Sequence, residues 1–326
     1  AEGLTAYNTT LKTLSLYDGT AWDTVVTENS GGSRFVDLTS QQSISGYKTF
    51  TNGLKVDGTI TLTDTSKIIM GADSDLETYH DGIKGHIKNI TGALNIESNN
   101  IEIGTFNNSA TGLRSIAIGA NTTASNTDAI AMGENTTATG ISSTAIGKAT
   151  NANADGATSM GNGTTASGVN STSMGVNTLA SGNHSTAMGN GTVASGTNSI
   201  SGGSSTTAGG NQSFAVGFST TANGTVATAM GNSTVASGTS ATAMGLYSVA
   251  SGVAATATGY DTEASGANST AMGKETTASG TNSFATGSST TASGDYSTAS
   301  GRSTFSTGGQ SFAAGFFSRA SGEYST

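Results

Sequence analysis

Glycine recurs with a strict 14-residue period through the last two thirds of this chain. One column holds fifteen glycines without a slip in register: Gly119, Gly133, Gly147, Gly161, Gly175, Gly189, Gly203, Gly217, Gly231, Gly245, Gly259, Gly273, Gly287, Gly301 and Gly315. A second column, from Gly112 to Gly322, has glycine at fourteen of its sixteen places, and Asn126 and Ala154 are the exceptions. Because Gly and Asn tolerate a left-handed backbone, we interpret both columns as tight turns. So strict a period argues against disorder, which the Gly-, Ser- and Thr-rich composition alone would suggest.

Two short segments with period-2 alternation lie between the glycine columns of each repeat. Alternation of this kind is typical of strands. Two strands and two turns in each repeat describe one coil of a solenoid. Fifteen such coils, stacked at about 4.8 Å, would form a rod of roughly 70 Å.

Four columns of small residues indicate the interior of each coil. They begin at Ser115, Ala117, Thr122 and Ala124 and hold almost only Ser, Ala and Thr. The neighbouring column that begins at Thr123 varies freely, which fits exposure to solvent. We therefore expect a thin roll with the Thr122 column facing inward. An ice-binding solenoid, which displays its Thr ladder outward, is a minor alternative.

The other face of the first strand carries larger apolar residues in two columns, which begin at Ile116 and Ile118. Seven of the eight Met residues lie in the second column, and large residues in one column accompany small ones in the other. An exposed apolar stripe of this length must be covered by another chain. We expect a homotrimer around a shared axis, although the columns alone also allow a dimer. The predicted axis residues are Ile116, Ile118, Ile130, Met132, Met160, Met174, Met188, Phe214, Met230, Met244, Met272, Phe284 and Phe312.

The repeat resembles the head domain of trimeric autotransporter adhesins, the YadA-like head. Its recurring Ser-Val-Ala-Ile-Gly string appears here at residues 115–119 (Ser-Ile-Ala-Ile-Gly), 129–133 (Ala-Ile-Ala-Met-Gly) and 143–147 (Ser-Thr-Ala-Ile-Gly). The resemblance covers residues 112–326. It implies a left-handed parallel β-roll that assembles as a trimer. The frequent Thr and Met of the two axial columns depart from the family pattern.

Residues 1–110 have no such period. Residues 54–62 alternate around Asp57-Gly58 and predict a hairpin, and residues 76–79, 83–90 and 94–103 also alternate, with turns at 81–82 and 91–92. Residues 27–33 are interpreted as a linker. We expect short antiparallel strands, divided into a small β module at 1–33 and a hairpin shaft module at 34–110, before the roll at 111–326.

Three strings in this part resemble segments of bacteriophage tail fibres, especially those of marine phages. They lie at residues 7–22, 42–54 and 75–82. The resemblance favours a phage tail fibre over the head domain of a bacterial trimeric surface adhesin, which stays the alternative. It implies an extracellular place on the virion, other virion or tail proteins as partners, and a host receptor bound through a tip. The alternative implies the bacterial cell surface. The chain stops at Thr326, just inside a new coil, so we expect the natural protein to continue.

Little in the sequence points to chemistry. His80 and Asp81 lie near Asp73, Asp75 and Glu77, which is conceivable as a metal site, but a solvated turn at Asp81 is the simpler interpretation. There is no Cys and no Walker or nucleophile-elbow motif, so we expect no enzyme and no cofactor. The net charge of −9 with scattered Lys and Arg predicts no nucleic-acid partner. No apolar run approaches the ~20 residues that span a bilayer, so no membrane insertion is expected.

The sequence thus predicts an all-β fold: a trimeric, left-handed parallel β-roll of 14-residue coils, preceded by short-stranded antiparallel β fibre modules. Its predicted function is structural. The trimeric fibre would belong to a phage tail or virion appendage and project a host-attachment tip.

Overall fold

A computed structural model describes residues 5–8, 13–17, 20, 22–28, 34–35, 59, 67–70, 76–80, 85–89, 100–104 and 108–326. The chain divides into two compact units, Ala1–Leu94 and Asn95–Thr326. All elements in the described ranges are strands.

The first unit contains two antiparallel sheets. One has the order β1 (Thr5–Asn8), β2 (Thr13–Tyr17), β3 (Trp22–Glu28) and β4 (Arg34–Phe35), and the other has the order β5 (Lys67–Met70), β6 (Leu76–His80) and β7 (Gly85–Asn89). Strands β6 and β7 confirm the strands predicted at 76–79 and 83–90. The hairpin predicted at 54–62 lies, apart from Thr59, outside the described residues, as do both predicted turns.

The linker predicted at 27–33 is wrong for its first two residues. Strand β3 continues through Thr27 and Glu28, which pair with Phe35 and Arg34 of β4. The backbone hydrogen bonds come from pairing with another strand, which the composition of residues 27–33 alone does not indicate. The first sheet thus extends past residue 33.

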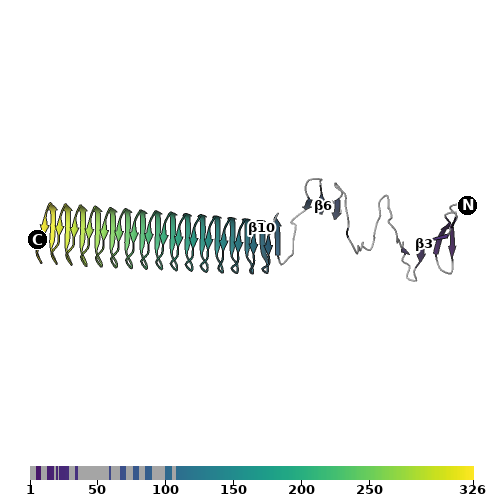
Figure 1. The fold of residues 1–326 in the computed structure, drawn as a ribbon, viewed down its shortest axis with the longest axis horizontal. Coiled ribbons are helices and arrows are strands. Elements are labelled where there is room, and N and C mark those ends of the chain that lie inside the picture. Colours follow the sequence, from purple (N-terminus) through teal and green to yellow (C-terminus); the bar gives the residue numbers. More distant parts are fainter. Residues whose placement is uncertain are drawn as a thin grey trace. The chain divides into compact units, whose positions relative to one another are not determined.

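The second unit is a parallel β-solenoid (Figure 1). One 16-stranded sheet, the wide sheet, contains β8 (Asn100–Gly104), β10 (Ser115–Ala120), β12 (Ile130–Glu134), β14 (Thr144–Lys148), β16 (Thr158–Asn162), β18 (Thr172–Val176), β20 (Thr186–Asn190), β22 (Ile200–Ser204), β24 (Phe214–Phe218), β26 (Thr228–Asn232), β28 (Thr242–Leu246), β30 (Thr256–Tyr260), β32 (Thr270–Lys274), β34 (Phe284–Ser288), β36 (Thr298–Arg302) and β38 (Phe312–Phe316). Each strand pairs with the equivalent strand of the next coil.

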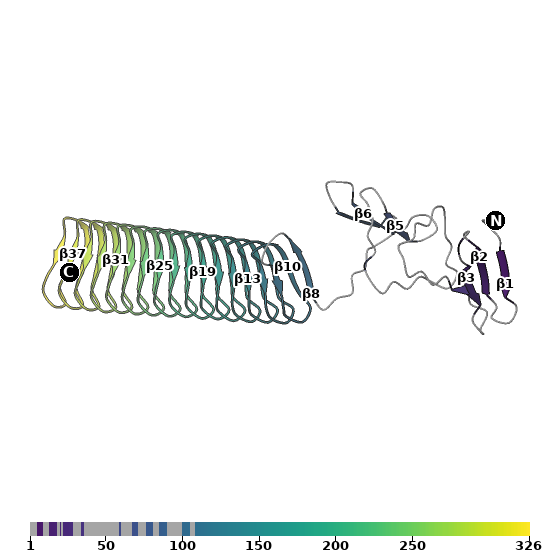
Figure 2. The same ribbon diagram turned by 45° about the vertical axis from the view of Figure 1, so that its right-hand side comes forward.

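The other 16-stranded sheet, the narrow sheet, is made of two-residue strands (Figure 2). These are β9 (Ser109–Ala110), β11 (Thr123–Ala124), β13 (Thr137–Ala138), β15 (Asn151–Ala152), β17 (Thr165–Ala166), β19 (Leu179–Ala180), β21 (Val193–Ala194), β23 (Thr207–Ala208), β25 (Thr221–Ala222), β27 (Val235–Ala236), β29 (Val249–Ala250), β31 (Glu263–Ala264), β33 (Thr277–Ala278), β35 (Thr291–Ala292), β37 (Phe305–Ser306) and β39 (Arg319–Ala320). Each coil therefore contributes one strand to each sheet, as the sequence predicts.

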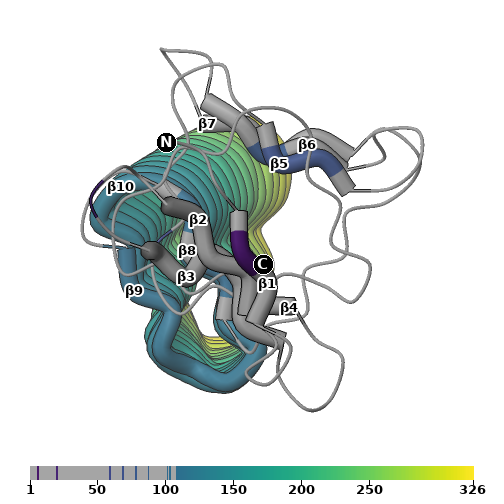
Figure 3. The backbone as a smooth tube through the Cα atoms, turned by 90° about the vertical axis from the view of Figure 1, so that its right-hand side faces the viewer, coloured from purple at the N-terminus to yellow at the C-terminus, as the bar shows by residue number. Residues whose placement is uncertain are grey.

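The pairing register repeats the sequence period. Ile116 pairs with Ile130 and Gly119 with Gly133, and pairing one full repeat apart continues to the last coil. Only the first pair of strands differs: Ile101 of β8 pairs with Ile116, fifteen residues later. The reason is that the connection from β8 to β9 is one residue longer than the equivalent connection in the next coil. The coils consequently lie nearly over one another when viewed along the stack (Figure 3). Strands β8 and β9 also place the beginning of the roll before residue 111.

The interior of the roll is filled by the four predicted columns of small residues. Ala117, Ala124 and their equivalents are buried. Thr122 and its equivalents as far as Thr304 are at most 1 % exposed. Two facing sheets this close leave room only for Ala, Ser and Thr. The inward direction predicted for the Thr122 column is confirmed, so this ladder is not presented to an external ligand such as ice.

The column of Gly119 needs glycine for two reasons. Its members have φ between 106° and 137°, where residues with a Cβ are strained. A Cβ on Gly119 would also overlap the carbonyl oxygen of Gly133 in the next coil. The tight turns predicted for this column are wrong, since these glycines lie inside the strands of the wide sheet. The same conflict recurs in every coil that is followed by another coil.

The column of Gly112 does not have the left-handed backbone that we inferred from its glycines and Asn126. None of its members has positive φ. A Cβ on Gly112 would instead overlap the backbone of Asn126, so close stacking of coils selects glycine. The left-handed residues lie two places later, in the column of Arg114, and in the column of Asn121, where non-glycine residues are common.

Candidate functional site

The outer face of the wide sheet carries the thirteen predicted axis residues. Ile116 and Ile118 flank the buried Ala117, so alternation turns them away from the interior. Their equivalents in later coils follow in register; for example, Met160 pairs with Met174, which pairs with Met188. The two columns thus form two parallel apolar rows along the stack.

These rows are only partly covered by their own chain. Met188 is 40 % exposed, Met272 42 % and Phe312 49 %, whereas the interior columns are almost fully buried. Phe214, Met174 and Met244 are half-buried. A soluble chain with a continuous patch of this kind normally uses it for contact with another protein.

Side-chain size varies along the rows from coil to coil. Phe284 is followed two residues later by Thr286, and Ile200 by Gly202. Gly202 is buried by its neighbours, and a Cβ placed there would just touch Val216 of the next coil. Large and small side chains are thus paired in several coils, whereas Ile130 and Met132 are both large and Thr256 and Thr258 are both small.

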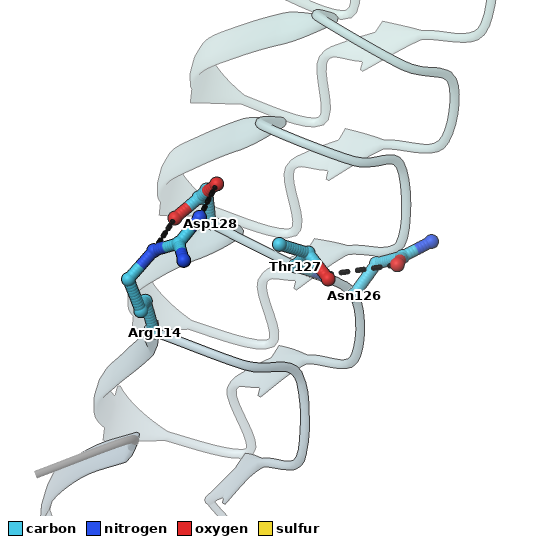
Figure 4. A network of polar contacts seen from close by, with 4 residues as sticks. All are labelled: Arg114, Asn126, Thr127 and Asp128. Atoms are coloured by element: carbon cyan, nitrogen blue, oxygen red, sulfur yellow. Dashed lines mark hydrogen bonds and ion pairs between the residues drawn. The ribbon is translucent and has the colours of Figure 1, made fainter.

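Charged residues lie along the two sides of the wide sheet where its strands begin and where they end, just outside the apolar rows. We call these two sides the edges of the wide sheet. On the edge before the strands, the Arg114 guanidinium donates two hydrogen bonds to the Asp128 carboxylate, both 2.6 Å long (Figure 4). This contact lowers the pKa of Asp128, chiefly through the hydrogen bond, and raises that of Arg114. On the edge where the strands end, Lys148 Nζ lies 3.3 Å from Glu134.

A second set of polar contacts lies further along the same edge. Lys274 Nζ is 3.4 Å from Glu275 and 5.7 Å from the centroid of the Tyr260 ring. Glu275 also accepts a hydrogen bond from Ser289 Oγ at 3.0 Å, and this bond, followed by Lys274, lowers its pKa. The sequence analysis did not identify these edge contacts. Arg114 and Asp128 carry opposite charges at the same place in successive repeats, and this pattern could have predicted their ion pair.

The corners between the sheets are closed by side chains as well as by glycine. Asn126 replaces glycine in the Gly112 column, and its Oδ1 accepts the N–H of Thr127 at 2.9 Å (Figure 4). Its Nδ2 donates to the Thr139 carbonyl at 3.2 Å. Asp155 and Asp295 accept the backbone N–H of Ile141 and Thr281 in the preceding coils, each at 2.8 Å. These carboxylates therefore serve the backbone.

The residues weighed as a metal site can be placed only in part. His80 ends β6 and Glu77 lies within that strand, but Asp73, Asp75 and Asp81 fall outside the described residues. Across the ranges that the structure describes, no three His, Cys, Asp or Glu side chains gather as metal ligands would. The same ranges include no helix that could span a membrane.

Comparison with known families agrees with this geometry. The model of the YadA head domain repeat (2 copies) matches eight consecutive stretches: residues 110–137, 138–164, 166–192, 194–220, 222–248, 250–276, 278–304 and 306–326. No curated protein matches the chain.

Proposed function

Because the chain belongs to the YadA head domain repeat family, we propose that it forms part of a homotrimeric, non-enzymatic fibre that works outside the cell. The observation that carries the proposal is the pair of apolar rows on the wide sheet. The roll is too thin to enclose them, and each row continues from coil to coil. Three copies around an axis parallel to the stack bury both rows at once.

The trimer makes the roll a mechanical element. Within each chain every coil is hydrogen-bonded to the next through both sheets, so the stack resists bending. Three such stacks joined along their length present three identical copies of whatever the fibre carries. Several weak contacts then act together through avidity.

The fibre's place is a phage tail or a related virion appendage, where it projects a host-attachment tip. This assignment is supported by the tail-fibre-like strings at residues 7–22, 42–54 and 75–82. Its partners are then other virion proteins and a host surface receptor. The alternative, supported by the family of the repeat, is the head of a bacterial surface adhesin.

Immunogold electron microscopy separates the two places. Antibodies against the repeat region should decorate thin fibres on phage particles released from the source culture. Label on the surface of intact cells, with bare particles, would replace the phage assignment by the adhesin. Label inside cells only would contradict both.

A further inference from the structure

Two ion pairs lie on opposite edges of the same three coils. Asp128 precedes β12 and Glu134 ends it, whereas Arg114 lies one coil before and Lys148 one coil after. All four side chains are well exposed, from 38 % for Asp128 to 61 % for Arg114. Charge is scarce in the roll, since residues 156–260 contain no Asp, Glu, Lys or Arg. The four charges are therefore not the by-product of a generally charged surface.

A three-fold arrangement brings these two edges together. If each chain turns its wide sheet to the axis, the edge of one sheet meets the opposite edge of the next, which is a heterologous contact that closes after three copies. Equivalent atoms of the three chains lie at the same height along the axis. Asp128 and Glu134 belong to one coil, so Asp128 of one protomer faces Glu134 of its partner.

Two carboxylates at one level would repel, but cations lie directly below and above them. Arg114 already reaches up one coil to Asp128, and Lys148 reaches down one coil to Glu134. We propose that at each seam between protomers these four residues form one ionic cluster, in which Arg114 and Lys148 each contact carboxylates of both chains. The inference rests on the proposed trimer and adds what holds its seams.

Cross-linking tests whether the edges meet. The chain has no Cys, so Thr239→Cys with Leu246→Cys places one thiol at each edge of β28 in a coil without charges. Within one chain the whole of β28 separates the two positions, on the order of 13 Å along the strand, beyond the reach of a short bis-maleimide. Across a seam they are neighbours, so we expect this reagent to give a covalent trimer on a denaturing gel. The control, Thr239→Cys with Val249→Cys on the narrow sheet, should stay monomeric.

The outcomes separate the two proposals. If the unmodified protein has the mass of three chains but the Thr239/Leu246 pair yields only monomers, the edges do not meet and the seam is refuted while the trimer stands. If the unmodified protein has the mass of one chain, the proposed trimeric fibre is refuted, and the ionic cluster with it.

A double-mutant cycle tests the ionic cluster itself. Arg114 and Glu134 lie on opposite edges and do not touch within a chain, so their effects should add unless they meet between chains. We expect the double variant Arg114→Gln/Glu134→Gln to shift the denaturation midpoint by an amount that differs clearly from the sum of the two single shifts. The difference should shrink as salt is raised. Arg114→Gln with Glu275→Gln, in a distant coil, serves as the additive control. Additivity in the first cycle, in a cross-linkable trimer, would overturn the ionic cluster.

Discussion

The hydroxyl groups of Ser173 and Thr178 lie 2.7 Å apart and form a hydrogen bond across the interior of one coil. The same bond joins Ser159 to Thr164 and Ser201 to Thr206, the other coils with Ser in the Ala117 column. Where that column holds Ala, the facing hydroxyl often has no partner, as at Thr136 opposite Ala131. A buried unpaired hydroxyl costs stability, so equivalent Thr residues in this interior differ in their contribution.

Thr136→Val should therefore raise the free energy of unfolding by about 1 kcal/mol, because it removes an unpaired buried hydroxyl without changing the shape. Thr178→Val should lower it by about 1 kcal/mol or more, because it leaves the Ser173 hydroxyl without its partner. Chemical denaturation of both variants measures the difference. Changes of the same sign and size would contradict the role assigned to the Ser173–Thr178 bond.

Gly161→Ala tests the stacking of coils at the Gly119 column. Gly161 has a φ of 127°, and a Cβ there would overlap the carbonyl oxygen of Gly175. We expect a loss of more than about 2 kcal/mol of stability, from backbone strain and overpacking together.

Gly163→Ala is the matched control two residues away. Gly163 is also left-handed, but its Cβ would overlap only the side-chain amide oxygen of Asn177, and Ala149 occupies the equivalent place in the preceding coil. The loss should be about 1 kcal/mol at most. Equal thermal shifts for the two variants would show that strain alone, and not contact between coils, selects glycine at Gly161.

Val226 occupies a left-handed corner that suits few residues. Its φ is 60° and its side chain is 48 % exposed, so a β-branched residue is strained there with little burial to compensate. Val226→Asn should raise stability by about 1 kcal/mol, because Asn tolerates this conformation. The reverse change in another coil, Asn198→Val, should lower stability by a similar amount. Thermal melting of the pair checks both signs, and a stabilising Asn198→Val would refute the explanation.

Much of the roll could be predicted from the sequence because the same environment recurs in every coil. A single Ser at one position says little, but a column of Ser and Ala from Ser115 onward indicates an interior. The period also located the exposed face of Ile116 and Ile118. The reason for glycine at Gly112 could not be predicted, because a tight contact and a left-handed backbone both select glycine. Contacts formed at only one place along the roll, such as Arg114 with Asp128, do not show as a uniform column of one residue type. Before residue 100 no repeat resolves the local ambiguity at residues such as Thr27.

Met174→Lys should disrupt assembly. It places a charge in the middle of the apolar rows, where an axis would leave the ammonium group buried and unpaired at a cost of several kcal/mol. Val235→Lys puts the same side chain on the narrow sheet and should leave assembly unchanged. Size-exclusion chromatography of the two variants distinguishes the faces. An assembled Met174→Lys variant, or a dissociated Val235→Lys variant, would place the interface elsewhere.

The mass of the unmodified protein in solution tests the central claim most directly. Light scattering should give a mass near three times the 32.0 kDa of one chain. A band of the same size on an unboiled denaturing gel would agree with chains joined along their whole length. A stable species with the mass of a single chain would mean that the apolar rows need no partner, and it would contradict both the trimer and the fibre.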